Sequence, residues 1–455
     1  MRLLTMTHRR RCIALATLIL AFGLLIGRAA TAEPAFVGLK VQGVELTIAR
    51  ALGMDTPRGV LVRDIALGGP GDKAGFRRGD LIVEFNGTAI DRFEKLINAV
   101  RALDAGAEVS VKVERADGGA SLDLKTVPWP DPWRIPEGST VRIPSAGMTV
   151  VALTPKVREE HGGRWGSTGV LVTAIDAGKS RKGAIAPGEL VVQINQNEIW
   201  LPQQVADAIK PSAATGSAEL LLLVEGRNGF RFALLPTSGK AAYPTGGGVA
   251  DLIAAGIQVE TLTPAAAAAL GIDGARGVLV WDVVPGSPAA AAGFRRGELI
   301  SEVGGKAVAT ADAFADAVRQ AAAGSVLDLS ASGPDGRAAR TMAIPTASSP
   351  ATVDDAFANL PDAGITVATV TPETRKTFGL RWAMEGVVVT LVEGATARES
   401  DLRRSDLILQ VAQRDVRTPD DVIAVYQRAK GSGLKNVLVT VENVGGSRFP
   451  LLPIR

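Results

Sequence analysis

Residues 59–65 read GVLVRDI, and this valine-rich segment decides the fold because the chain repeats it three more times. The other copies are GVLVTAI from Gly169, GVLVWDV from Gly277 and GVVVTLV from Gly386, so successive copies begin 110, 108 and 109 residues apart. Solenoid and propeller repeats are about 20–50 residues long, whereas about 100 residues suffice for a small domain with its own core. The chain is therefore predicted to be an array of four similar domains.

A second signature follows each valine-rich segment and supports the same conclusion. It reads GFRRGDLIVEFNG from Gly75, IAPGELVVQINQ from Ile185, GFRRGELISEVGG from Gly293 and LRRSDLILQVAQ from Leu402. Between the repeats lie PWPDPWRIPEGS from Pro128, PTSGKAAYPTGGG from Pro236 and PTASSPATVDD from Pro345. Their proline, glycine and serine content is typical of linkers, which we expect to be flexible.

The first repeat predicts a small unit of mainly β structure with short helices. Strands are expected near residue 39, over 59–65 and over 81–85, a short helix over 47–52, and a closing hairpin around 117–119. An amphipathic helix is predicted where apolar residues recur at i, i+3, i+4 and i+7: Phe93, Leu96, Ile97 and Val100.

Residues 1–32 are predicted to be a signal peptide rather than part of the fold. Three consecutive arginines, Arg9 to Arg11, precede an apolar stretch over 13–26, and a small-residue cleavage site follows at 30–32. The apolar stretch is shorter than the roughly 20 residues that a membrane-spanning helix needs. A retained inner-membrane anchor is the alternative, because Arg28 interrupts the approach to the cleavage site.

Charge and cysteine content exclude several classes of function. The leader holds five of the 50 basic residues and no carboxylates, so 45 basic and 47 acidic residues remain without it. That balance lacks the positive excess typical of nucleic-acid binding, and no nucleic-acid partner is expected. Cys12, the only cysteine, lies in the leader, which excludes disulfides and cysteine-ligated metals in the remainder. No metal or other cofactor is expected.

Repeat 3 carries a strong family resemblance. From Leu262 it reads LTPAAAAALGIDGARGVLVWDVVPGSPAAAAGFRRGELISEVGGKAV, which resembles the PDZ domains of bacterial HtrA/Deg-type periplasmic serine proteases. Repeat 1 is similar through GVLVRDI and AGFRRGDLIVEFNGTAI, repeat 2 has an altered middle, and repeat 4 diverges most. The resemblance implies four tandem PDZ-like β-sandwich or partly open barrel domains, over residues 36–127, 146–236, 255–345 and 363–454 (units 1 to 4), without the protease domain.

A PDZ-like fold would bind an extended peptide, usually a free C-terminus, as an added strand. Such a site needs a turn that aims backbone N–H groups at the carboxylate, and glycine allows the close approach. An apolar-Gly-apolar step recurs 21–22 residues before each valine-rich segment. The candidate peptide-binding residues are these: Val37, Gly38, Leu39, Ala146, Gly147, Met148, Ala255, Gly256, Ile257, Ala363, Gly364 and Ile365.

The amphipathic helix would line the other side of each groove. Its apolar positions correspond between the units by spacing: Leu96 and Val100, Val205 and Ile209, Phe314 and Val318, Val422 and Tyr426. The same spacing is expected for core residues that hold the helix on the sheet, and this second interpretation is favoured because apolar helix stripes usually face inward.

Nothing in the sequence indicates catalysis. A serine protease needs histidine as the general base, and His161, the only histidine outside the leader, stands where the other units have Leu52, Leu270 and Phe378. No G-x-S-x-G step marks a nucleophilic serine. The sequence therefore predicts a non-enzymatic periplasmic adaptor that captures protein C-termini or unfolded segments. A periplasmic protease or envelope complex would act in trans. An HtrA-like peptidase and a spacer with closed grooves are the alternatives.

Overall fold

The computed structural model describes residues 34–454 except 67, 136–138, 162–163, 179–184, 215–218, 238–241, 285, 346–355, 395–398 and 444–445. The leader predicted over 1–32 lies outside the described residues. No helix in the described part of the chain is long and apolar enough to cross a membrane.

Units 1 and 2 each build an antiparallel sheet edged by short helices. Unit 1 contains β2 (Leu39–Gly43), α2 (Leu46–Ala51), β3 (Val60–Ile65), α3 (Pro70–Lys73), β4 (Leu81–Phe85), β5 (Thr88–Ala89), α4 (Phe93–Arg101), β6 (Glu108–Arg115) and β7 (Gly118–Lys125). Unit 2 contains β10 (Met148–Ala152), α5 (Pro155–Glu160), β11 (Val170–Ile175), β12 (Leu190–Ile194), β13 (Asn197–Glu198), α6 (Pro202–Ala214), β14 (Glu219–Gly226) and β15 (Gly229–Pro236).

Units 3 and 4 repeat this order of elements. Unit 3 contains β18 (Ile257–Thr261), α7 (Pro264–Ala269), β19 (Val278–Val283), α8 (Pro288–Ala291), β20 (Leu299–Val303), β21 (Lys306–Ala307), α9 (Ala311–Gln320), β22 (Val326–Gly333) and β23 (Gly336–Ala343). Unit 4 contains β25 (Ile365–Thr369), α10 (Pro372–Phe378), β26 (Val387–Val392), β27 (Leu407–Val411), β28 (Arg414–Asp415), α12 (Pro419–Gly431), β29 (Asn436–Asn443), β30 (Gly446–Arg448) and β31 (Leu451–Pro453).

All four sheets share one strand order. In unit 1 it is β2-β3-β4-β6-β7, with β5 attached to β4, and the corresponding strands are paired in the same order in the other units. The valine-rich strand is an interior strand of the sheet, and its alternate residues, such as Val60 and Val62, are fully buried in the unit's own core. The predicted mainly β fold with short helices and four PDZ-like domains is confirmed.

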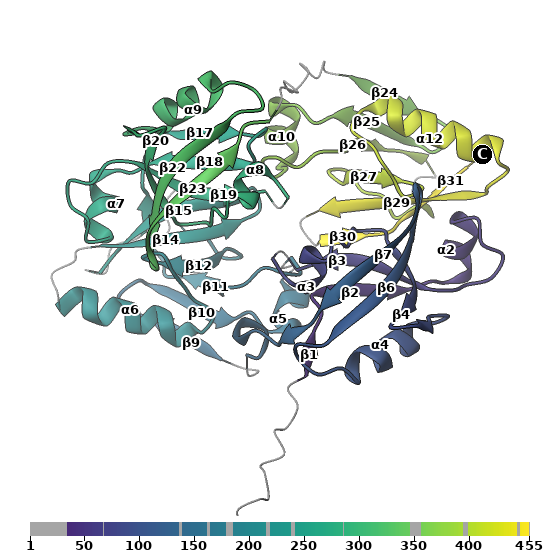
Figure 1. Ribbon diagram of the computed structural model, residues 1–455, viewed down its shortest axis with the longest axis horizontal. Helices are drawn as coiled ribbons and strands as arrows, with labels where there is room; N and C mark the ends of the chain where they lie inside the picture. The colour runs from purple at the N-terminus through teal and green to yellow at the C-terminus, as the bar shows by residue number, and fades with distance from the viewer. Residues whose placement is uncertain are drawn as a thin grey trace, which may run out of the picture.

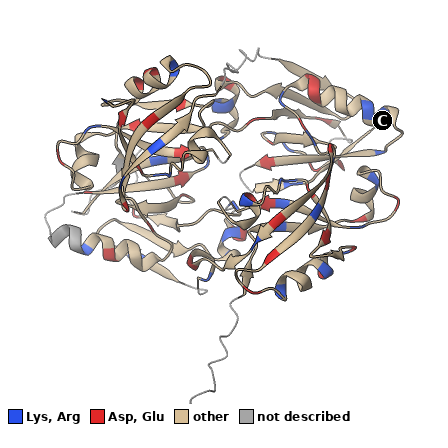
Figure 2. Ribbon diagram, viewed as in Figure 1, with Lys and Arg blue, Asp and Glu red and all other residues tan. Residues whose placement is uncertain are grey.

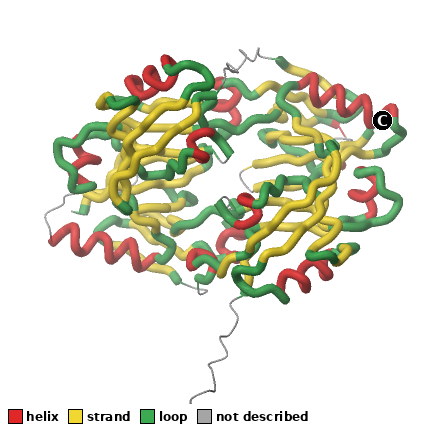
Figure 3. Tube along the Cα trace, in the orientation of Figure 1, coloured by secondary structure: helices red, strands yellow, loops and turns green. Residues whose placement is uncertain are grey.

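The four units form a closed ring (Figure 1). Unit 1 lies beside unit 4 and unit 2 lies beside unit 3, although units 1 and 4 are the farthest apart in sequence. The longer helices α4, α6, α9 and α12 lie on the outside, as the red segments of Figure 3 show. The array predicted from the repeat is therefore a ring rather than an open string.

The two side-by-side pairs use the same surface. Between units 1 and 4, Ile48 and Leu61 pack with Leu438 and Phe449 in a shared apolar cluster. Between units 3 and 2, the corresponding Ala266 and Leu279 pack with Leu221 and Phe232. Each residue of the second cluster lies 217 or 218 positions from its counterpart in the first. The ring therefore has an approximate two-fold axis that exchanges units 1 and 2 with units 3 and 4.

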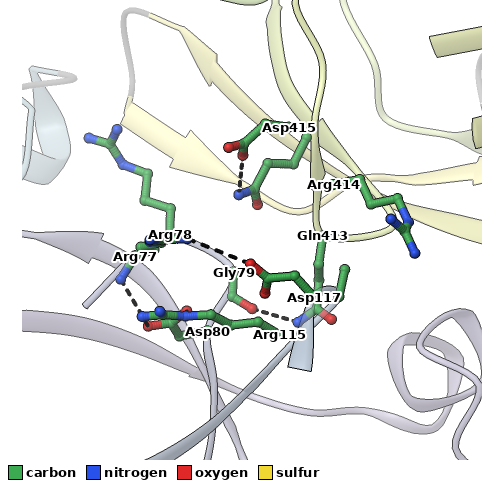
Figure 4. Close-up of a pocket in the computed structure, with 11 residues that line it drawn as sticks. Arg77, Arg78, Gly79, Asp80, Arg115, Asp117, Gln413, Arg414 and Asp415 are labelled. Carbon is green, nitrogen blue, oxygen red and sulfur yellow. Dashed lines mark hydrogen bonds and ion pairs between the residues drawn. The ribbon is translucent and has the colours of Figure 1, made fainter. Parts of the chain in front are cut away.

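Hydrogen bonds at the edge of these interfaces repeat the same symmetry. Gln413 of unit 4 donates to the carbonyl oxygen of Gly79 in unit 1 (2.6 Å), beside a cavity of about 280 Å³ (Figure 4). Gln196 of unit 2 donates to the carbonyl oxygen of Gly297 in unit 3 (2.8 Å). Both interfaces are therefore specified by polar as well as apolar contacts.

Buried ion pairs join units 2 and 4 across the centre of the ring. Arg164 pairs with Glu442, and Arg381 pairs with Glu225. Glu442 also forms an ion pair with Arg78 of unit 1 (3.4 Å), so residues of three units meet at one carboxylate. Figure 2 shows charged residues of both signs around this centre. Buried charges need close partners because their desolvation is costly, so these pairs restrict how the units are placed.

The expectation of flexible linkers is wrong for the described parts of the linkers. β8 (Val127–Pro128) pairs with β1 (Ala35–Phe36), and the 3-10 helix η1 (Asp131–Trp133) follows it. β16 (Tyr243–Pro244) adds to the sheet of unit 2. Between the end of each predicted linker and the next unit a further strand forms: β9 (Thr140–Ile143), β17 (Val249–Leu252) and β24 (Phe357–Leu360). The linkers are ordered because their apolar residues and backbone groups complete neighbouring sheets, which composition alone does not reveal.

Candidate functional site

The four apolar-Gly-apolar steps form one kind of turn. Their glycines have φ of 67°, 61°, 68° and 68° at Gly38, Gly147, Gly256 and Gly364, a region that residues with a Cβ rarely adopt. Each glycine carbonyl accepts a hydrogen bond from within its own unit, at 2.7–2.9 Å, from the N–H groups of Ala66, Asp176, Val284 and Glu393. The turns are thus fixed to their sheets.

In units 2, 3 and 4 the segment preceding the turn occupies the groove. β9 pairs with β10, β17 with β18 and β24 with β25, each antiparallel and at the outer edge of the sheet. The same three strands contact α6, α9 and α12. Each strand therefore lies between the first strand of the unit and the amphipathic helix, where a bound peptide would lie in a PDZ-like fold.

The turn N–H groups of these three units are used by the same segments. Ala146 donates to the carbonyl of Ile143 (3.2 Å), and Ala363 to that of Leu360 (3.0 Å). Gly256 donates to the carbonyls of Leu252 (2.8 Å) and Ile253 (3.0 Å). Neutral carbonyl oxygens of the chain itself thus stand where the carboxylate oxygens of a ligand were expected.

An aliphatic side chain from each segment enters the core. Ile143, Leu252 and Leu360 lie opposite Met148, Ile257 and Ile365 and are 3–7% exposed. They share core clusters with the helix residues of their units, namely Val205 and Ile209, Phe314 and Val318, Val422 and Tyr426. In these units the helix stripe belongs to the core, as the favoured interpretation had it.

Unit 1 differs because the outer edge of β2 is unpaired. In the described part of the chain β2 pairs with β3 alone. The preceding strand β1 is turned away and pairs with β8. The ring of Phe36 packs between Trp129 and Trp133, at centroid distances of 5.1 and 5.5 Å. No hydrogen bond joins the N–H of Val37 or Gly38 to any residue that the structure describes. Among the described residues, the turn of unit 1 therefore has backbone donors without an acceptor beside a strand edge without a partner.

The open groove also exposes apolar side chains. Leu39, Val41 and Val100 are only half-buried, whereas their counterparts in the other units, such as Ile257, Val259 and Val318, are buried. Leu96 lies at the floor and is buried, and Phe93 at the start of α4 is 37% exposed. The groove of unit 1 is thus an unfilled version of the three filled ones.

Charged residues of both signs surround Lys40 on the opposite face of β2, namely Arg63, Asp64, Arg158 and Glu159. Lys40 points away from the groove, because side chains alternate along a strand. Burial is the main cause that lowers the pKa of Lys40, and the nearby Arg63 lowers it further. The groove itself is lined by apolar residues, so backbone donors supply its polarity.

The structure brings together no catalytic arrangement around His161 within the described residues. This histidine is exposed at the end of α5, beside a cavity of about 910 Å³ lined mainly by units 2 and 4. Ser167 lines the same cavity, but its hydroxyl donates to Glu225 (3.0 Å). Among the described residues, no group of three His, Cys, Asp or Glu side chains could hold a metal ion.

The three strands that fill the grooves are not among the elements predicted from the sequence. Their signal is an aliphatic residue five positions before the apolar residue that follows each turn glycine: Ile143, Leu252 and Leu360. At this register unit 1 has Pro34, which forms an isolated bridge with Asp104 instead. The missed signal was a short alternation between the end of each predicted linker and the start of units 2, 3 and 4.

Comparison with known families identifies the units. The PDZ domain model matches residues 36–126, and a second PDZ domain model matches residues 279–329. The chain carries PDZ domains. The matches fall in units 1 and 3, and units 2 and 4 repeat the same strand order.

The curated relatives are longer proteins that match part of this chain. A probable periplasmic serine endoprotease DegP-like from Chlamydia trachomatis is 27% identical over 192 residues, which are 42% of this chain and 37% of the relative. The protein of the same description from Halomonas elongata is 27% identical over 175 residues, 38% of this chain and 36% of the relative. The chain thus spans little more than a third of the length of these relatives.

Solved structures give a similar but partial match. The HtrA-type protease AlgW with tripeptide is 21% identical, with a TM-score of 0.22, over 27% of this chain and 39% of that one. The HtrA3 PDZ domain bound to a phage-derived ligand is 20% identical, with a TM-score of 0.18, over 20% of this chain and 84% of that one.

Proposed function

We propose that this protein is a peptide-binding adaptor in which the PDZ domain of unit 1 captures extended C-terminal segments. The unpaired edge of β2 beside α4, with the unused N–H groups of Val37 and Gly38, is the observation that carries the proposal. A peptide added there would form backbone hydrogen bonds with β2 and place its last side chain between Leu39 and Val100.

Units 2, 3 and 4 serve a different purpose in this proposal. Their grooves hold the chain's own strands, so each is a rigid part of the ring rather than a second binding site. The spacer function considered from the sequence is thus assigned to these three units. It follows that the protein offers one groove to a ligand, and avidity among four sites is not part of the proposal.

A non-enzymatic function in the periplasm fits the same observations. The family models match PDZ domains, which are binding modules, and the DegP-like relatives are named as periplasmic. His161 is exposed, and Ser167 is bonded to a carboxylate instead. We propose that the adaptor presents captured C-termini or unfolded segments to a periplasmic protease or envelope complex in trans, as part of envelope protein quality control.

Binding of a free C-terminus provides the test. The peptide Gly-Val-Ala-Asp-Leu copies residues 248–252, the segment that fills the groove of unit 3. We expect the full chain to bind this peptide as the free acid, measured by isothermal titration calorimetry. The C-terminal amide should bind about tenfold to a hundredfold more weakly, because a charge-assisted hydrogen bond is lost.

Two valine substitutions distinguish loss of the binding turn from backbone strain elsewhere in unit 1. Gly38→Val should abolish binding, because the turn requires φ of 67°. Gly53→Val is the matched control: Gly53 has φ of 75° in the same unit, and nothing lies within 4 Å of the added Cβ. If the acid and the amide bind equally well, the turn does not recognise the ligand's carboxylate. If the peptide is cleaved, the protein is an enzyme and the proposal of a non-enzymatic adaptor is wrong.

A further inference from the structure

The three filled grooves define where each residue of a bound strand lies. We number the residue opposite Met148, Ile257 or Ile365 as position 0. Position 0 is then Ile143, Leu252 or Leu360, and position −2 is Val141, Ala250 or Ala358. At position −4, the carbonyls of Ser139, Gly248 and Ala356 accept hydrogen bonds from Ala152, Thr261 and Thr369, at 2.8–3.0 Å. All three segments thus follow one register over five residues.

This register transfers directly to unit 1. Leu39 corresponds to Met148, Ile257 and Ile365, so a ligand's last residue would lie opposite Leu39, its −2 residue opposite Val41 and its −4 residue opposite Gly43. Residues two apart on a strand point to the same face. The ligand side chains at positions 0, −2 and −4 would therefore all face α4.

The distal end of the groove is built differently in unit 1. The counterparts of Gly43 carry side chains, and in unit 3 the hydroxyl of Thr261 accepts a hydrogen bond from the N–H of Ala311 at the start of α9 (2.9 Å). Unit 1 has glycine at this strand position and a phenylalanine, Phe93, at the start of α4. A Cβ placed on Gly43 would lie 3.5 Å from the Cβ of Phe93. Phe93 thus stands beside a strand position that has no side chain of its own.

The segments that fill the other grooves are small at position −4. They carry serine, glycine or alanine there, and the helix residues at the position of Phe93 are Pro202, Ala311 and Pro419. In unit 1 Phe93 is 37% exposed, and a Cβ added to Gly43 would meet the Cβ of Phe93 only at an ordinary contact distance. An exposed aromatic ring gains stability when an apolar side chain covers it.

We propose that Gly43 and Phe93 form a distal subsite that selects a large apolar side chain four residues before the C-terminus of the ligand. The proposal rests on peptide binding by unit 1 and makes that site longer and more selective. It assigns to Phe93 a role in specificity that its counterparts in the filled grooves do not have. Two anchors, at positions 0 and −4, would together fix the register of the ligand.

A pair of peptides and a pair of variants test the subsite. Phe-Val-Ala-Asp-Leu should bind the full chain about threefold to tenfold more tightly than Gly-Val-Ala-Asp-Leu, because the added ring buries part of its apolar surface on Phe93. In Phe93→Ala this ratio should fall to about one, while the glycine peptide keeps its affinity. Phe357→Ala removes another exposed phenylalanine, on β24 of unit 4, and should keep the ratio.

The outcomes separate this inference from the proposed function. If neither peptide binds the unchanged chain, unit 1 is not a peptide site and both proposals are wrong. If both peptides bind equally well, or if the preference for phenylalanine persists in Phe93→Ala, peptide binding stands and the distal subsite is wrong. Circular dichroism of Phe93→Ala would show that its fold is retained.

Discussion

Among single residues, one position distinguishes unit 1 from the others. It lies five residues before the apolar residue that follows the turn glycine. Ile143, Leu252 and Leu360 are buried there in the cores of units 2, 3 and 4, where they fix the preceding strand in the groove. Pro34 at the same register cannot donate a backbone hydrogen bond and bridges to Asp104. A small difference in sequence thus accompanies the difference between an open groove and a filled one.

Glu260 gives a residue-scale prediction about pH. Burial raises the pKa of Glu260, while hydrogen bonds from Thr245, Trp281 and the N–H of Gly247 oppose the shift. A carboxyl whose pKa is higher in the folded state favours folding when protonated. Its contribution is full below the ordinary pKa of about 4.5 and is lost as pH rises through the folded-state value.

Replacing Glu260 by glutamine should remove this loss of stability with rising pH. Glu260→Gln stays neutral at every pH, so its melting temperature relative to the unchanged chain should rise between about pH 4 and pH 7, whatever constant cost follows from replacing one acceptor oxygen by an NH2 group. Differential scanning fluorimetry across this range measures the difference. A difference that is constant with pH would show that Glu260 does not titrate within the folded state in this window.

At the scale of elements, β9, β17 and β24 are structural strands whose loss would open a core. Each closes a groove by pairing with the first strand of its unit and by inserting an aliphatic side chain under the helix. The same first strand in unit 1, β2, has one strand partner, β3, and its Leu39 and Val41 pack against the unit's own core. An edge strand that is left open in this way is a natural template for another strand.

Truncating one of these inserted side chains should therefore lower the free energy of unfolding more than truncating a side chain in the groove of unit 1. Leu252→Ala removes a buried side chain and should lower the free energy of unfolding by about 2–4 kcal/mol. Leu39→Ala removes a half-buried one and should cost about 1 kcal/mol, since less apolar area is lost. Denaturant unfolding followed by tryptophan fluorescence measures both. Equal losses would mean that β17 contributes little to the core of unit 3.

At the scale of the whole molecule, the ring is held by contacts between units that are distant in sequence. Arg63 donates to the carbonyl of Ser447, 384 residues away (2.7 Å), and Trp382 donates to Asp282 (2.9 Å). The approximate two-fold symmetry and the string AGFRRG shared by units 1 and 3 agree with duplication of an ancestral pair of domains. A ring of this kind holds the open groove at a fixed orientation.

The central ion pairs give the prediction at this scale. Glu442→Ala leaves Arg164 and Arg78 without their shared carboxylate, and breaking a buried pair costs about 3–5 kcal/mol. Its two-fold counterpart, Glu225→Ala, leaves Arg381 unpaired and should cost a similar amount. Glu108→Ala breaks an exposed pair with Lys125 and should leave the stability unchanged. Chemical denaturation measures all three. A loss in Glu442→Ala no larger than in Glu108→Ala would contradict a structural role for the centre.

The repeat, the fold class and the position of each turn can be predicted from the amino-acid sequence. These features depend on local patterns: valine-rich strands, glycines where φ is positive, and helix stripes at 3.6-residue spacing, as at Leu96 and Val100. Which grooves are filled, and how the units close into a ring, depend on the tertiary structure. Edge pairing by β9, β17 and β24 joins residues only five positions apart at the turn, but it also needs the helix and core that take up each inserted side chain. Ion pairs such as Arg164–Glu442 join residues far apart in the sequence, and they form because buried charges need partners.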